Sequence, residues 1–246
     1  MKEKTKVFKQ SILPNKSTLR NTEVNDNYGD KLRDFILGGQ DGLVNVLGLV
    51  LAVASATNSV NVVFIASLAA LFSESISMGA VAYTSQKTSN EYFQKELARK
   101  TKLIETQPKI QKEIVRTIYK EKGFSSVQLE EITSVLTSNK QVWLNTLMKE
   151  ELNLSYTKED PFTSALMVGI SAVVGSAIPI IPFLFAPVSI AMWYSLIISI
   201  ITLFVAGAIK SKLTIGNWVR GGIELAIIGT ASAILGFVIG KSLSMV

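Results

Sequence analysis

Five long stretches of apolar and small residues, almost free of charge, constrain this chain more than any other feature. They cover residues 35–56, 62–85, 162–185, 188–209 and 219–240. About 20 such residues are enough for a helix to cross a bilayer. Inside lipid the backbone must satisfy its own hydrogen bonds, which favours helices. The sequence therefore predicts an all-α polytopic membrane protein with five transmembrane helices.

Most charged residues lie in two blocks, residues 1–34 and 87–160, although only 18% of the chain is charged. Of 25 Lys and Arg residues, eight lie in the first block and thirteen in the second, while turns 57–61 and 186–188 carry none. If the spans alternate, both basic blocks share one side of the membrane, which the positive-inside rule identifies as cytoplasmic. The net charge of +6 then reflects topology, and no nucleic-acid partner is expected.

The same patterns divide the chain into four parts. We expect, in chain order, a mobile polar N-terminal tail (1–32), transmembrane helices 1 and 2 (33–86), an inserted cytoplasmic helical domain (87–160) and transmembrane helices 3 to 5 (161–246). In the insertion, Pro108 is expected to begin a helix that ends at Gly123. In the third span, Pro179 and Pro182 are expected to produce a kink.

Two acids and a methionine lie inside the first two spans. Asp41 follows a pair of glycines in span one, and Glu74 precedes Met78 by four residues in span two, on the same helix face. An ionisable residue at membrane depth is a functional hypothesis by default. With no Lys or Arg near them in the spans, these acids must be protonated or bind a cation. The alternative is a structural set, with the acids bonded to hydroxyl groups and the methionine filling space.

Composition narrows the chemistry that is open to this chain. It contains no Cys and no His, which excludes disulfides, Cys/His zinc sites and histidine triads. There is no glycine-rich phosphate loop, and we expect neither an enzyme nor a cofactor. Carboxylates combined with a thioether suit Fe²⁺ or Mn²⁺ as the substrate better than Zn²⁺ or Cu⁺.

The acids of the insertion are a second group of candidate metal ligands. Most charges on such helices are simply solvated. Met148, Glu150 and Glu151 are more suggestive, because sulfur and carboxylates occur together near a helix end. Glu96 and Glu113 are expected to approach them if the helices of the insertion fold back on one another.

Stripes of small residues, spaced four and three apart, mark spans two and five and predict close helix packing. The members are Ala66, Ala70, Ser73, Ser77, Ala80 and Thr84 in span two, and Gly222, Ala226, Gly229, Ala233, Gly236 and Gly240 in span five. For span five, packing across a subunit interface is one possible use of the stripe.

Several motifs of the chain are distinctive. They are RDFILGGQDGLV (33–44), SISMGAVAYTSQ (75–86), the acid-rich insertion ending in MKEEL, DPFTSALMVGISAVVGSAIPIIPFLF (160–185) and GGIELAIIGTASAILGFVIG near the C-terminus. Together these motifs resemble the vacuolar iron transporter family of divalent-metal carriers. The resemblance implies a five-span homodimer that exchanges cytosolic Fe²⁺, and often Mn²⁺, for protons. Asp41 matches the pathway aspartate of the family and Met78 its pathway methionine. Many members carry a Glu four residues after that methionine, where this chain has Ala82, so Glu74 is the candidate to supply the charge.

Taken together, the residues and the resemblance predict a proton-coupled exporter of Fe²⁺ or Mn²⁺ in the cell membrane or a vacuole-type membrane. Asp41, Glu74 and Met78 would form the path, and Glu96, Glu113, Met148, Glu150 and Glu151 would collect the ion. Two other classes stay open. One is a non-transporting membrane sensor or buffer of metal, and the other is a membrane enzyme that uses carboxylate catalysis.

Overall fold

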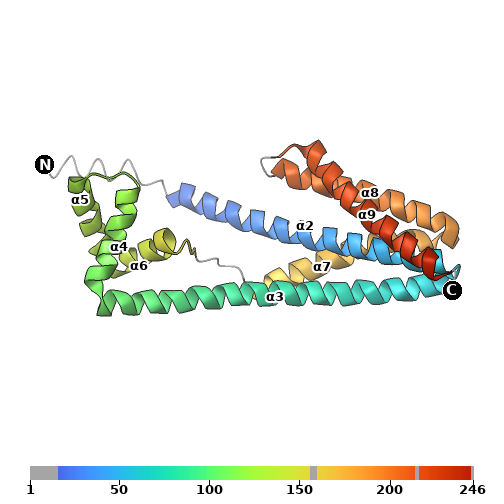
Figure 1. The fold of residues 1–246 in the computed structure, drawn as a ribbon, viewed down its shortest axis with the longest axis horizontal. Coiled ribbons are helices and arrows are strands. Elements are labelled where there is room, and N and C mark those ends of the chain that lie inside the picture. The colour runs from blue at the N-terminus through green and yellow to red at the C-terminus, as the bar shows by residue number, and fades with distance from the viewer. Residues whose placement is uncertain (1–15, 156–159, 214–215, 245–246) are drawn as a thin grey trace. The chain divides into compact units, whose positions relative to one another are not determined.

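The computed structural model describes residues 16–155, 160–213 and 216–244, and all regular structure in these ranges is helical (Figure 1). The contacts between residues divide the chain into two compact units. Unit 1 comprises Met1–Tyr83 and Pro161–Val246, and unit 2 comprises Thr84–Asp160. The long helix α3 contributes its first part to unit 1 and its second part to unit 2.

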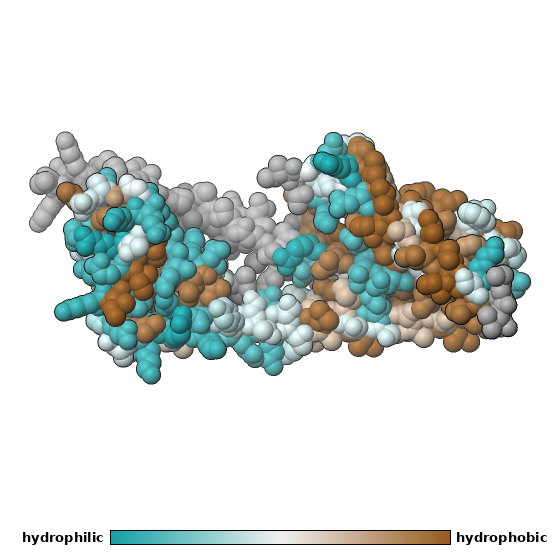
Figure 2. Space-filling view, viewed as in Figure 1, coloured by the Kyte–Doolittle hydropathy of each residue, from teal (hydrophilic) through white to brown (hydrophobic). Residues whose placement is uncertain are grey.

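Five helices contain stretches long and apolar enough to cross a membrane. They are α2 (Lys16–Ala56), α3 (Val60–Thr106), α7 (Pro161–Ile180), α8 (Val188–Leu213) and α9 (Trp218–Leu243). In Figure 2, hydrophobic residues cover much of the visible surface of these helices, as expected for side chains that face lipid. The prediction of an all-α chain with five helices long and apolar enough to span a membrane is confirmed.

Helix α2 starts further toward the N-terminus than the sequence predicts. It begins at Lys16, within the segment expected to be a mobile tail, whereas residues 1–15 lie outside the described residues. Once a helix has formed, each added residue fixes one more pair of backbone dihedrals and gains one hydrogen bond in return. Extending the first span into a polar segment therefore costs little free energy.

Glycines allow the helices of unit 1 to approach one another closely. A Cβ added at Gly175 of α7 would lie 1.9 Å from the carbonyl oxygen of Gly39 on α2. A Cβ added at Gly236 of α9 would lie 2.0 Å from the carbonyl oxygen of Gly48, also on α2. The glycine stripe of α9 thus packs within the chain. Gly236 and Gly240 approach the backbone of α2, and Gly222 and Gly229 face side chains of α8.

The prolines of the third span change its helix type. Helix α7 contains Pro179 and is followed by a 3₁₀ turn, η2 (Ile181–Leu184). The hydroxyl of Ser195 on α8 donates a 2.8 Å hydrogen bond to the carbonyl of Pro179. This side chain satisfies a backbone acceptor that the change of helix type would otherwise leave unpaired in an apolar environment.

Unit 2 is a small helical domain formed by the second part of α3 and the segments that follow it. These are α4 (Pro108–Glu121), α5 (Ser126–Thr137), α6 (Lys140–Thr146) and a π-helical turn, η1 (Leu147–Glu151). Pro108 begins α4 as predicted, and Gly123 follows its end with a φ of 91°. Ser125 and Gln128 form a capping box at the start of α5. The apolar core includes Val115, Trp143, Leu144, Leu147 and Met148.

Candidate metal site in the spanning helices

Two carboxyl groups and an amide come together between α2 and α3. The Nδ2 atom of Asn45 lies 2.9 Å from Oε1 of Glu74 and 3.4 Å from Oδ2 of Asp41. The side-chain amide of Asn45 therefore bridges the two carboxyl groups. Residues 29 positions apart in the sequence therefore form one polar cluster inside the spanning helices of unit 1.

Helix periodicity explains how α2 presents this cluster. Gly38 and Gly42 lie one turn apart on the face that packs against α7, where a Cβ at Gly42 would be 2.6 Å from the carbonyl of Ala172. Asp41 and Asn45 are also one turn apart, on a different face of the same helix. The glycines fix α2 against α7, and the polar pair is left to meet Glu74 of α3.

Met78 lies one turn beyond Glu74 on α3, and both side chains are half-buried. The neighbouring Gly79 packs against α7, where an added Cβ would lie 3.2 Å from the carbonyl of Ala165. The next face of α3, which carries Ser73 and Ser77, is exposed in the single chain. Glu74 and Met78 thus lie at the border between the packed and the exposed side of this helix.

The described side chains give the cluster no basic counter-charge. Across residues 32–155, 160–213 and 216–244, no Lys or Arg forms an ion pair with Asp41 or Glu74. Two carboxylates this close repel each other, and a proton or a cation between them relieves that repulsion. Such a pair can therefore alternate between a protonated and a cation-bound state.

The predicted ligands of the insertion do not converge on one point. Met148 is 2% exposed in the apolar core, whereas each of the four acids pairs with a basic side chain. The pairs are Glu96 with Arg99 at 2.8 Å, Glu151 with Lys100 at 2.5 Å, Glu113 with Arg116 at 3.7 Å, and Glu150 with Lys122. Among the described residues, no group of three or more His, Cys, Asp or Glu side chains is arranged to hold a metal ion.

The ion pair between Lys122 and Glu150 affects the titration of the lysine. Lys122 donates to the carboxylate of Glu150, and this hydrogen bond raises the pKa of Lys122 above its ordinary value of 10.5. The shift favours the charged ammonium form of Lys122.

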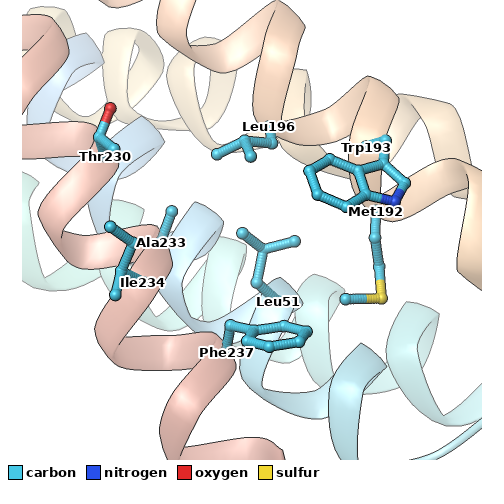
Figure 3. Close-up of a pocket in the computed structure, with 8 residues that line it drawn as sticks. All are labelled: Leu51, Met192, Trp193, Leu196, Thr230, Ala233, Ile234 and Phe237. Carbon is cyan, nitrogen blue, oxygen red and sulfur yellow. The ribbon is translucent and has the colours of Figure 1, made fainter.

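A groove elsewhere in unit 1 is unsuited to an ion. Residues of α2, α8 and α9 surround a hollow of about 250 Å³, among them Leu51, Trp193, Leu196, Ile234 and Phe237 (Figure 3). Its lining offers no carboxylate, and the hard oxygen ligands that a divalent ion prefers are found instead in the Asp41–Glu74 cluster.

Sequence reasoning overlooked two residues of these sites. Asn45 follows Asp41 by four positions, and this spacing places both side chains on one helix face. The spacing could have predicted that Asn45 belongs to the cluster. Lys100 carried no such signal, because lysines on the insertion helices are common and only the folded structure shows that this one is buried.

The helices and the cluster together define a class of protein. It is a helical membrane protein with several apolar helices, two of which hold neighbouring acids. A model of the VIT family matches residues 32–241. The chain therefore belongs to the vacuolar iron transporter (VIT) family, and the resemblance read from its motifs is confirmed.

Similar proteins span nearly the whole chain. The chain is 30% identical over 245 residues to vacuolar iron transporter 1 of Arabidopsis thaliana, covering 97% of each protein. It is 30% identical over 217 residues to the vacuolar iron transporter of Centaurea cyanus, covering 87% of this chain and 88% of the relative. A vacuolar iron transporter of Toxoplasma gondii is 26% identical over 88% of this chain.

Proposed function

We propose that this protein is a proton-coupled carrier that moves Fe²⁺, Mn²⁺ or both out of the cytosol. The observation that carries the proposal is the cluster of Asp41, Asn45 and Glu74, which places two acids inside spanning helices, with no basic partner among the described side chains. The names of the relatives, vacuolar iron transporters, support a metal ion as the substrate.

The coupling follows from the chemistry of the acid pair. When the pair holds a divalent ion, both carboxylates are ionised, and when the ion leaves, protons restore neutrality. A carrier that exposes this pair alternately to the two sides of the membrane therefore exchanges metal for protons. Met78, one turn from Glu74, adds a soft sulfur ligand that favours Fe²⁺ and Mn²⁺ over Mg²⁺ and Ca²⁺.

We further propose that the carrier works as a homodimer. Asn45 and the Ser73–Ser77 face of α3 are exposed in the single chain, although they lie within spanning helices. Polar groups at membrane depth avoid lipid and face protein or a water-filled cavity. A second copy of the chain would cover this face and enclose the acids at the contact.

The charge pattern supports a topology for the proposed carrier. Residues 87–160 carry thirteen bases, and the turn between the first two spans carries none. By the positive-inside rule, the N-terminus and the insertion lie in the cytosol. The metal then leaves the cytosol, across the cell membrane or into a vacuole-type compartment.

Flux measurements on purified protein test this function. In proteoliposomes, Fe²⁺ or Mn²⁺ uptake should rise when a pH gradient is imposed, and Asp41→Asn or Glu74→Gln should lower it at least tenfold. Glu224→Gln is the matched control, because it removes an exposed acid of α9 outside the cluster. Metal binding without flux would favour a sensor or buffer, and equal flux in Glu74→Gln would refute the acid-pair mechanism.

A further inference from the structure

The helical insertion contains a lysine that is almost completely buried. Lys100 of α3 is 2% exposed, and its Nζ atom lies 2.5 Å from Oε1 of Glu151. Lysine is almost never buried unless it is paired, because removing an ammonium group from water is costly. The carboxylate of Glu151 therefore neutralises the charge of the Lys100 ammonium.

A π-helical turn separates the ligands that the sequence placed side by side. The amide of Leu152 donates to the carbonyl of Leu147, five residues earlier, over 3.3 Å. This wider turn directs Met148 into the apolar core, while Glu151 meets Lys100 and Glu150 meets Lys122. The sulfur and the two carboxylates consequently have different neighbours.

The other polar groups inside the insertion offer little to a divalent ion. The buried polar residue of α4 is Gln111, a neutral amide that is 3% exposed, while the acid Glu113 lies on the exposed side. Glu96, one turn before Lys100, is paired with Arg99. A divalent cation needs several oxygen ligands at once, and these acids are already neutralised by basic side chains.

We propose that the Lys100 ammonium is the resident cation of the helical insertion. It holds Glu151 in the way that a bound divalent ion would, so the insertion folds and remains folded without metal. The inference rests on the proposed function in one respect, because it leaves the Asp41–Glu74 pair as the place where the chain binds its divalent substrate.

The first test asks whether the insertion binds metal. The protein for this test is the full-length double variant Asp41→Asn/Glu74→Gln in nanodiscs. It lacks the acid pair of the spanning helices and keeps every residue of the insertion. In equilibrium dialysis, this protein should bind no Mn²⁺ in a stoichiometric amount. The hydrogen-exchange rates of peptides from residues 84–160 should be the same in Mn²⁺ and in EDTA. Stoichiometric Mn²⁺ that is lost on adding Glu151→Gln would overturn the proposal.

The second test asks whether the ammonium holds the insertion together. Lys100→Met leaves the carboxylate of Glu151 without its partner, so hydrogen exchange in peptides around 93–104 and 143–152 should become about tenfold faster or more. Lys100→Met/Glu151→Leu removes both charges and should restore slow exchange. Lys102→Met, at an exposed position two residues away, is the control. Exchange in Lys100→Met that matches this control would refute the proposal.

Failure of this inference is distinguishable from failure of the proposed function. Wild-type flux is measured in the same preparation as the exchange. A metal-independent insertion in a protein without flux would overturn only the carrier function. Flux that survives, together with Mn²⁺ bound at Glu151, would overturn only the role of Lys100.

Discussion

Asn45 links two acids that would otherwise repel each other. Its amide lies 2.9 Å from Glu74 and 3.4 Å from Asp41, so a single neutral donor holds both carboxyl groups in one place. Hydrogen bonds to charged groups contribute roughly 1.5–3 kcal/mol. We therefore expect Asn45→Leu to lower the affinity for Mn²⁺, measured from the concentration dependence of flux, by about 10- to 100-fold.

A neighbouring amide provides the comparison for Asn45. Gln40 lies next to Asp41 on the same helix, but it is not part of the Asp41–Asn45–Glu74 cluster. Gln40→Leu should leave the concentration dependence of flux close to that of the parent. If Asn45→Leu and Gln40→Leu behaved alike, the bridging role of Asn45 would be wrong, and general polarity of α2 would explain the effect.

At the scale of the elements, contact between α9 and α2 depends on the absence of a side chain at Gly236. An added Cβ would lie 2.0 Å from the carbonyl oxygen of Gly48, so one helix backbone would have to move. Overpacking of this kind costs about 1–3 kcal/mol. Gly236→Ala should therefore lower the temperature at which the detergent-solubilised protein loses its monodisperse peak in size-exclusion chromatography.

Gly39→Ala is the matched change on α2. A Cβ there would lie 3.5 Å from the carbonyl oxygen of Ser171, an ordinary contact. Because alanine favours helix over glycine by about 1 kcal/mol, this variant should be as stable as the parent or slightly more so. Equal losses in both variants would show that close approach at Gly236 is not what limits stability.

The elements were largely predictable from sequence, because their signals are local. Apolar runs of membrane length placed the five spans, and Pro108 and Gly123 placed the limits of α4. The neighbours of each side chain were not predictable in the same way. Glu151 meets Lys100, 51 positions away, through a π-helical turn that leaves no mark in the residue pattern. The Asp41–Glu74 pair likewise depends on how α2 and α3 pack.

At the scale of the whole molecule, the exposed face of α3 is the strongest argument for a second copy of the chain. Ser73 and Ser77 are exposed beside Glu74, and the large apolar side chains of Phe72 and Ile76 are 59% and 72% exposed. Small residues at a spacing of four allow backbones to approach, and in a two-fold dimer the same face meets itself. The acids would then lie next to the contact between the two copies.

Because the natural chain contains no cysteine, one introduced thiol can report this contact. Ser77→Cys in native membranes should form a covalent dimer on mild oxidation, since a disulfide requires Cβ atoms about 4 Å apart. Ile201→Cys is the control, because Ile201 is 57% exposed on α8, away from the α3 face. Efficient cross-linking of Ser77→Cys alone would place the two-fold axis beside α3. If only Ile201→Cys cross-linked, the dimer would form through α8. Something other than the second copy would then have to shield Asp41 and Glu74 from lipid.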